Sequence, residues 1–260
     1  KSKMPNKKTI RIPVAEPYFG KKEKKYINQC IDSGWVSSTG SFVEKFEKKC
    51  ADFSNAKYGI ATSNGTTALH LALLACGIKK GDEVIVPTLT FISTANAVKY
   101  TGATPVFIDS QKKSWNMDPD LIESAITPKT KAIIPFHLFG LPADMDPIMS
   151  VAKKNKLFVI EDAAEAQGAL YKGRPVGSIG HIGTFSFYGN KIITTGEGGM
   201  IVTNNQKVQE KIKILRDHGM SKTKRYLHNV LGYNYRLTNI QAAIGVAQME
   251  KIKSILLSKS

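Results

Sequence analysis

Short apolar runs alternate with amphipathic stretches along most of the chain, from Tyr58 onward. The stretches between the runs predict helices, and strands that alternate with helices pair in parallel through right-handed crossovers. The pattern therefore predicts an α/β domain whose sheet is covered on both faces. The predicted strands are Tyr58–Ala61, Glu83–Val86, Thr104–Ile108, Ala132–Pro135, Leu157–Ile160 and Met200–Thr203, and the predicted helices are Gly65–Cys76, Ile92–Tyr100, Pro119–Ala125 and Asp146–Asn155.

Amphipathic helices are also predicted outside this region. Lys21–Ser33 and Gly40–Phe53 place apolar side chains near helical spacing. Thr238 can cap a helix that begins at Asn239 and directs an apolar face toward a packing partner, and we expect part of that face to stay exposed. The predicted organisation is a helical segment at 1–55, a large α/β domain at 56–237 and the start of a further domain at 238–260.

Composition agrees with a folded globular chain. The 260 residues are 42% hydrophobic and 22% charged, which is enough to bury a sizeable core and excludes a disordered protein. The most apolar region, Val84–Val98, is interrupted by polar residues, so no stretch reaches the ~20 residues of a transmembrane helix. The three cysteines show no CxxC spacing, so we expect no metal site, thiols in a reducing compartment and a cytoplasmic location.

The net charge is strongly positive, with 37 Lys and Arg against 21 Asp and Glu, so that 37 − 21 = +16. A nucleic-acid-binding protein would cluster these cations among aromatic residues. Here the lysines are scattered in pairs over segments that look like exposed helix faces. We favour surface lysines that attract a small anionic substrate, and the nucleic-acid interpretation remains the alternative.

Three segments carry candidate chemistry, and the first is Ser63–Leu69. It lies between a predicted strand and a predicted helix, and Gly65 lets a ligand approach while the following amides point outward. Unpaired amides at a helix start suit a phosphate. The alternative is an ordinary capped helix without a ligand.

The second segment is Val159–Glu165, which places Asp162 at the end of an apolar strand. Open α/β sheets bind their ligands at that end. A buried carboxylate there needs a cationic partner, because desolvation would otherwise neutralise it. The alternative is an acid that caps the next turn.

The third segment, Ser186–Met200, holds a single lysine, Lys191, among aromatic residues, threonines and glycines. A lysine with a free pKa of ~10.4 becomes a useful nucleophile only when its surroundings favour the neutral amine or when it is held as an imine. A surface lysine in a turn is the alternative, and the combination of the three segments argues against it.

Six motifs in this order resemble the DegT/DnrJ/EryC1/StrS family of sugar aminotransferases, and the resemblance spans Ile10 to Lys253. Within that family, Glu165 and the Ser-Phe-Tyr-Gly-Asn-Lys string resemble the GDP-perosamine synthases. The motifs are Ser-Asn-Gly-Thr-Thr-Ala-Leu at 63–69, Pro-Thr-Leu-Thr-Phe at 87–91, Glu-Asp-Ala-Ala-Glu-Ala at 161–166, Ser-Phe-Tyr-Gly-Asn-Lys at 186–191, Gly-Glu-Gly-Gly at 196–199 and Gly-Tyr-Asn-Tyr-Arg-Leu at 232–237.

The resemblance implies a fold of type I for pyridoxal phosphate enzymes, with a mostly parallel seven-stranded sheet, and it implies a role for each matching residue. Lys191 would form the imine with pyridoxal phosphate and move the proton, and Asp162 would pair with the pyridine nitrogen. Gly65, Thr66 and Ser186 would bind the cofactor phosphate, and Phe91 would stack on the cofactor ring. Glu165 would lie near the phenolic oxygen of the cofactor. Asn234 would reach the cofactor phosphate of a neighbouring subunit.

The implied reaction moves an amino group from L-glutamate to a nucleotide-linked 4-keto-6-deoxy sugar, for O-antigen, capsule or glycan assembly. The implied partners are these two substrates and a second copy in a homodimer, with no nucleic acid and no membrane. Relatives continue past the Asn239 helix into a small C-terminal domain that closes over the substrate. We therefore expect this domain to be largely missing, and a non-catalytic, truncated member that binds the cofactor or partner subunits is the alternative function.

Overall fold

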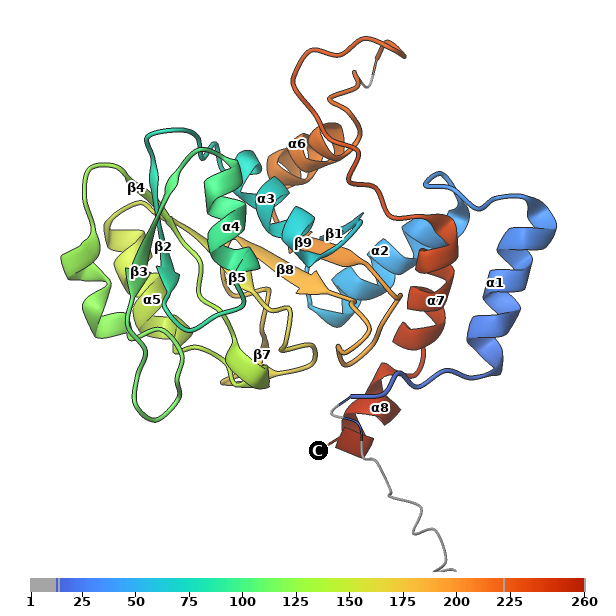
Figure 1. The fold of residues 1–260 in the computed structure, drawn as a ribbon, viewed down its shortest axis with the longest axis horizontal. Helices are drawn as coiled ribbons and strands as arrows, with labels where there is room; N and C mark the ends of the chain where they lie inside the picture. The colour runs from blue at the N-terminus through green and yellow to red at the C-terminus, as the bar shows by residue number, and fades with distance from the viewer. Residues whose placement is uncertain (1–12, 14, 222, 260) are drawn as a thin grey trace, which may run out of the picture.

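The computed structural model describes residues 13, 15–221 and 223–259, and in these residues a seven-stranded sheet forms the centre of the molecule (Figure 1). The strand order is β1-β9-β8-β5-β4-β2-β3, and a separate hairpin is formed by β6 and β7. The strands are β1 (Tyr58–Thr62), β2 (Glu83–Pro87), β3 (Thr104–Ile108), β4 (Thr130–Ile133), β5 (Phe158–Asp162), β6 (Leu170–Tyr171), β7 (Arg174–Pro175), β8 (Ile182–Ser186) and β9 (Gly199–Thr203).

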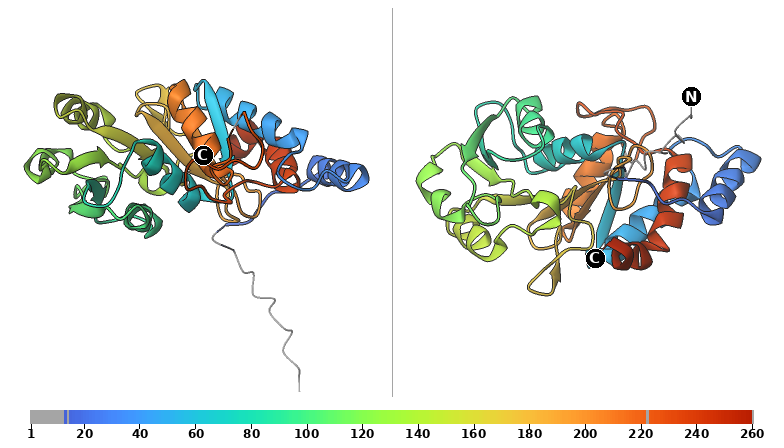
Figure 2. Two further views of the ribbon diagram at one scale, coloured as in Figure 1. Left: turned by 90° about the horizontal axis from the view of Figure 1, so that it is seen from above. Right: turned by 60° about the horizontal axis from the view of Figure 1, so that its bottom comes forward.

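Eight α-helices are described around the sheet. Figure 2 shows the molecule from two further directions, with α1 at its outer edge, where it packs against α7. They are α1 (Lys21–Ser33), α2 (Ser41–Phe53), α3 (Gly65–Ala75), α4 (Ser93–Tyr100), α5 (Met145–Lys154), α6 (Gln206–Arg216), α7 (Asn239–Met249) and α8 (Ile252–Lys259).

The sheet confirms the predicted fold class. Strands β8, β5, β4, β2 and β3 pair in parallel, whereas β9 pairs antiparallel with both β8 and β1. Strand β8 was absent from the strands predicted by pattern, because it carries Gly183, Thr184 and Ser186 in place of an apolar run. It is buried all the same, because it lies inside the sheet between β9 and β5 and α3 packs against it.

One predicted helix is wrong. Pro119–Ala125 forms two 3₁₀ turns, Pro119–Leu121 and Glu123–Ala125, instead of an α-helix. Seven residues are too few to stabilise an α-helix without strong packing, and short segments commonly form 3₁₀ turns. The pattern also failed to predict α6, whose lysines interrupt its apolar face.

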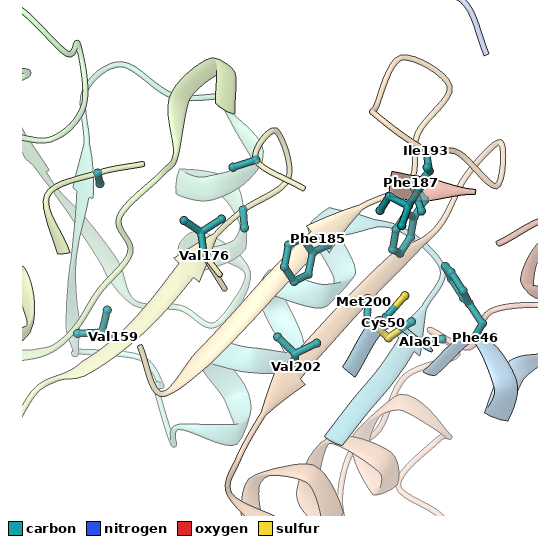
Figure 3. Close-up of a cluster of buried hydrophobic side chains, with 14 of the residues drawn as sticks. Phe46, Cys50, Ala61, Val159, Val176, Phe185, Phe187, Ile193, Met200 and Val202 are labelled. Atoms are coloured by element: carbon teal, nitrogen blue, oxygen red, sulfur yellow. The ribbon is translucent and has the colours of Figure 1, made fainter. Parts of the chain in front are cut away.

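Alternation along the strands divides the core into two layers. Ile60, Val84 and Ile160 face α3, α4 and α6, whereas Ala61, Ile85 and Val159 face the opposite side. Figure 3 shows part of the second layer, in which Phe185, Phe187 and Met200 gather near α2.

Helices α1 and α2 pack against α7 and cover most of it. Ile240, Ile244 and Met249 stay partly exposed, as expected for part of the apolar face. Ala243, Val246 and Ala247 are buried. The contact is close, because a Cβ at Gly245 would lie 2.6 Å from a ring atom of Phe46. Thr238 caps α7 as predicted, with Oγ1 accepting from the Gln241 amide at 3.3 Å. The three-part division of the chain stays a prediction.

None of the described helices is both long and apolar enough to cross a bilayer.

Candidate active site

A cavity of about 360 Å³ lies at the carboxyl ends of the parallel strands, where α/β sheets bind their ligands. It collects seven of the eight predicted site residues from four separate segments of the chain. These are Gly65, Thr66, Phe91, Asp162, Glu165, Ser186 and Lys191.

The first wall of the cavity is the N-terminus of α3. Asn64 caps the helix, because its Oδ1 accepts from the Thr67 amide at 2.9 Å. The amides of Gly65 and Thr66 have no acceptor within the described part of the chain, and such amides are donors for an anion. A Cβ at position 65 would come 2.9 Å from Cβ of Ser186, so glycine lets β8 and α3 meet here.

The second wall is the end of β5, where neighbouring carboxylates point in opposite directions. Glu161 is fully buried away from the cavity and accepts from the amides of Gly177, Ile179 and Gly180 at 2.5–2.7 Å. Its remaining partner is Nε2 of His137, at 3.0 Å. Glu161 is therefore fully hydrogen-bonded and has a structural role.

Asp162 lines the cavity with a carboxyl group that is 1% exposed. Burial raises its pKa, although hydrogen bonds from Thr94 and Ala164 and the charges of His137 and Lys191 oppose this effect. The bond from Thr94 Oγ1 to Oδ2 is 2.7 Å long. Because no cation pairs directly with it among the described residues, this carboxyl would gain from a positively charged ligand.

Lys191 reaches the same cavity from the loop after β8. Its Nζ lies 3.4 Å from Oε1 of Glu165, and the two side chains are 17% and 23% exposed. Oε2 of Glu165 accepts from the Phe139 amide at 3.0 Å. The amine is thus accessible, held beside one carboxylate, and close to the buried Asp162 pocket.

Asn234 does not line this cavity. Its Oδ1 accepts from Nη2 of Arg236 at 3.0 Å, and the backbone of Asn234 bridges to Asp217 beside the end of α6. Phe91, by contrast, stands at the cavity wall and is 65% exposed.

Sequence reasoning missed Thr94, which holds Asp162 in place. Thr94 is fully buried at the start of α4, and its Oγ1 also lies 2.9 Å from Oγ1 of Thr90. The signal was present in the sequence as two threonines four residues apart after an apolar strand. Periodicity gives no means of pairing them with an acid 68 residues later.

The donor set of this cavity fits pyridoxal phosphate. Two free amides and the Ser186 hydroxyl suit a phosphate, and a buried carboxyl with a raised pKa suits a pyridinium nitrogen. A lysine amine suits an aldehyde, and the exposed face of Phe91 offers an apolar wall for a ring.

Comparisons with known proteins agree with this geometry. The GDP-perosamine synthase of Escherichia coli O157:H7 is 54% identical over 248 residues, which cover 95% of this chain and 68% of that protein. The aminotransferase of Psychrobacter cryohalolentis superposes with a TM-score of 0.88 at 43% identity, covering 92% of this chain and 64% of the other. The pyridoxal phosphate form of Spr1654, a putative sugar aminotransferase from Streptococcus pneumoniae, superposes with a TM-score of 0.89 at 31% identity. The match covers 94% of this chain and 68% of the other.

The chain thus spans about two thirds of the length of these relatives. The model of the DegT/DnrJ/EryC1/StrS aminotransferase family matches residues 17–260. The resemblance seen in the six motifs is confirmed, and the chain belongs to this family.

Proposed function

We propose that the chain carries the catalytic site of a pyridoxal phosphate-dependent aminotransferase that moves an amino group from L-glutamate to a GDP-linked 4-keto-6-deoxy sugar. One observation carries the proposal: a lysine amine, a buried carboxyl of raised pKa and two free helix amides line one cavity. The sugar and its nucleotide follow the 54% identity to a GDP-perosamine synthase.

The pyridoxal group, when bound, supplies an electron sink for proton transfer at the amino-bearing carbon. Lys191 is the base that takes and returns this proton, because its amine is accessible and faces the cavity. Asp162 keeps the ring nitrogen protonated, since a cation next to this desolvated carboxyl stabilises both charges. The amides of Gly65 and Thr66, with Ser186, hold the phosphate.

Glu165 lines the same cavity. Its carboxylate already pairs with Lys191 and with the amide of Phe139. A phenolic oxygen placed nearby would share a proton with it, because two adjacent anions repel. We propose that Glu165 holds the phenolic side of the cofactor and the Lys191 amine together.

We propose a homodimer with shared sites, on the strength of Asn234. This side chain lies outside the cavity of its own chain, beside the end of α6, and the segment that leads to it exposes Tyr226 and Leu231. Such a segment gains by burying its apolar side chains against a second copy. We propose that Asn234 then reaches the cofactor phosphate of the neighbouring subunit.

A test of the function uses purified protein loaded with pyridoxal phosphate. L-glutamate should bleach the visible band of the bound cofactor, and a panel of keto-sugar nucleotides should restore it, with the GDP-linked 4-keto-6-deoxy sugar fastest. A band that glutamate leaves unchanged would contradict the aminotransferase and favour the non-catalytic alternative.

The shared site is tested by mixing two inactive variants. Lys191→Ala and Asn234→Ala subunits should regain part of the activity on exchange, because one hybrid site then holds both native groups. Exchange without recovery would argue for sites built within one chain.

A further inference from the structure

A buried glutamine contacts both ends of the loop that carries Lys191. Gln167 follows Glu165 by two residues in the turn after β5 and is 6% exposed. Its Nε2 donates to the Ser186 carbonyl at 2.6 Å, and its Oε1 accepts from the Ile193 amide at 3.3 Å. These two backbone groups lie on either side of Lys191 in the sequence, so one side chain bridges both ends of its loop.

The loop has little regular structure of its own. Residues 189–195 form turns, bends and irregular backbone, and the Lys191 amide bonds locally to the Tyr188 carbonyl at 3.0 Å. The far end of the loop is anchored by Ile193, which is 1% exposed in the same apolar layer as Phe187 (Figure 3). The planar carboxamide of Gln167 fixes the separation of the two ends, since neither can move far without losing its hydrogen bond.

These contacts require an amide side chain at position 167. The Ser186 carbonyl can only accept and the Ile193 amide can only donate, so the group between them must present one donor and one acceptor. A carboxylate lacks the donor, and a hydrocarbon side chain lacks both. Either change would cost the loop at least one of the bonds that join it to the turn after β5.

The groups that the loop carries belong to the proposed site. Nζ of Lys191 lies 3.4 Å from Oε1 of Glu165, which comes from the same turn as Gln167. Ser186 lines the cofactor cavity together with Lys191. The turn after β5 therefore holds the lysine at two places, at its amine through Glu165 and at its loop backbone through Gln167.

We propose that Gln167 is a positioning residue for Lys191 and Ser186. It is not among the residues that line the cofactor cavity, and it acts through the backbone of the loop. The inference rests on the proposed function, in which the Lys191 amine must meet the reacting carbon. A small displacement of such a group lowers the rate steeply.

The test measures the reactivity of the Lys191 amine in the cofactor-free chain. Competitive acetylation with acetic anhydride and peptide mapping give its labelling rate relative to that of Lys207, an exposed lysine on α6. Gln167→Met keeps the length of the side chain and removes both hydrogen bonds. Lys191 should then react about fivefold faster, because the released amine spends less time paired with Glu165.

Gln248→Met is the matched control. Gln248 is also buried, at 1% exposed, and its Nε2 donates to the Tyr18 carbonyl at 2.9 Å and to Oε1 of Glu23 at 2.6 Å, outside the loop. This variant should lower the free energy of unfolding in urea, as Gln167→Met does, because both lose buried hydrogen bonds. Labelling of Lys191 should stay within about twofold of the native rate.

Gln167→Glu provides a second variant of nearly the same shape. It keeps the acceptor for the Ile193 amide but places an oxygen against the Ser186 carbonyl, so it should also speed the labelling of Lys191. The proposal is overturned if both Gln167 variants react at the native rate, or if Gln248→Met accelerates the reaction equally.

A second measurement uses the chain loaded with pyridoxal phosphate. Gln167→Met should slow the half-reaction with L-glutamate about tenfold, with a smaller change in the half-saturating glutamate concentration. Equal rates for the native chain and this variant would contradict the positioning role. If glutamate fails to bleach the native chain, the proposed function is wrong, and the labelling of Lys191 still decides whether Gln167 holds the loop.

Discussion

The two faces of the end of β5 hold adjacent carboxyl groups that are buried to the same degree but receive different numbers of hydrogen bonds. Glu161 receives three amide hydrogen bonds and one from His137. Asp162 receives one side-chain hydrogen bond, from Thr94, and one long backbone bond, from Ala164 at 3.3 Å. Burial alone therefore does not identify a functional acid, whereas burial without sufficient donors does.

This contrast supports a different role for each residue. The Glu161 carboxylate joins β5 to the 177–180 loop, so its hydrogen bonds stabilise the fold. The Asp162 carboxyl faces a cavity, and burial raises its pKa. Both features favour a cationic ligand beside it.

Loss of the Glu161 carboxylate should have the largest effect. Glu161→Ala leaves three buried amides and His137 without their acceptor, so the free energy of unfolding should fall by about 3–5 kcal/mol. Urea denaturation measures this. Glu44→Ala, at an exposed position on α2, is the control and should change it by less than about 0.5 kcal/mol. Equal stability of the two variants would refute the structural role of Glu161.

Asp162→Asn should affect chemistry next most strongly. The variant removes the counter-charge of the ring nitrogen but keeps most contacts, so the half-reaction with L-glutamate should slow about hundredfold, near 2.7 kcal/mol. Stopped-flow absorbance measures the rate, and cofactor titration should show a much smaller change in affinity. A near-native rate would mean that the nitrogen has another partner.

The same substitution should stabilise the cofactor-free protein. The pKa of Asp162 is raised in the folded state, so the unfolded chain loses this proton first and stability declines as the pH rises through the folded pKa. Asp162→Asn removes this loss and should raise the free energy of unfolding more at pH 8 than at pH 4. Thermal melts of the native chain and the variant at both pH values measure the gain in stability. An equal gain at pH 8 and pH 4 would contradict this prediction.

Thr94→Val should have the smallest effect. It removes the 2.7 Å hydrogen bond to Asp162 without a change in shape, at a cost of about 1–2 kcal/mol at pH 8. The loss should shrink at acid pH, where the carboxyl is neutral. The double variant with Asp162→Asn should show less loss than Thr94→Val alone, and strict additivity would indicate that the two side chains do not interact.

Local pattern predicted the elements that carry their own signal. The helix Lys21–Ser33 and the cap at Thr238 were both read from a few neighbouring residues. The pattern did not predict strand β8, because most of its side chains are small or polar and its burial depends on packing with elements such as α3. The split between Glu161 and Asp162 follows from strand alternation, but the donors that satisfy Glu161 come from a distant loop.

The candidate site was predicted largely by motif, and its supporting contacts were not. The resemblance placed seven residues that the fold brings to one cavity. It gave no information on Thr94, which donates to Asp162.

The most direct test of the account locates the covalent bond to the cofactor. The protein is incubated with pyridoxal phosphate, reduced with borohydride, digested and mapped by mass spectrometry. We predict a single major pyridoxyl group on Lys191, because this amine lines the cavity beside Asp162 and the free amides of α3. A label spread over other lysines, with Lys191 unmodified, would contradict the assignment of this cavity as the active site.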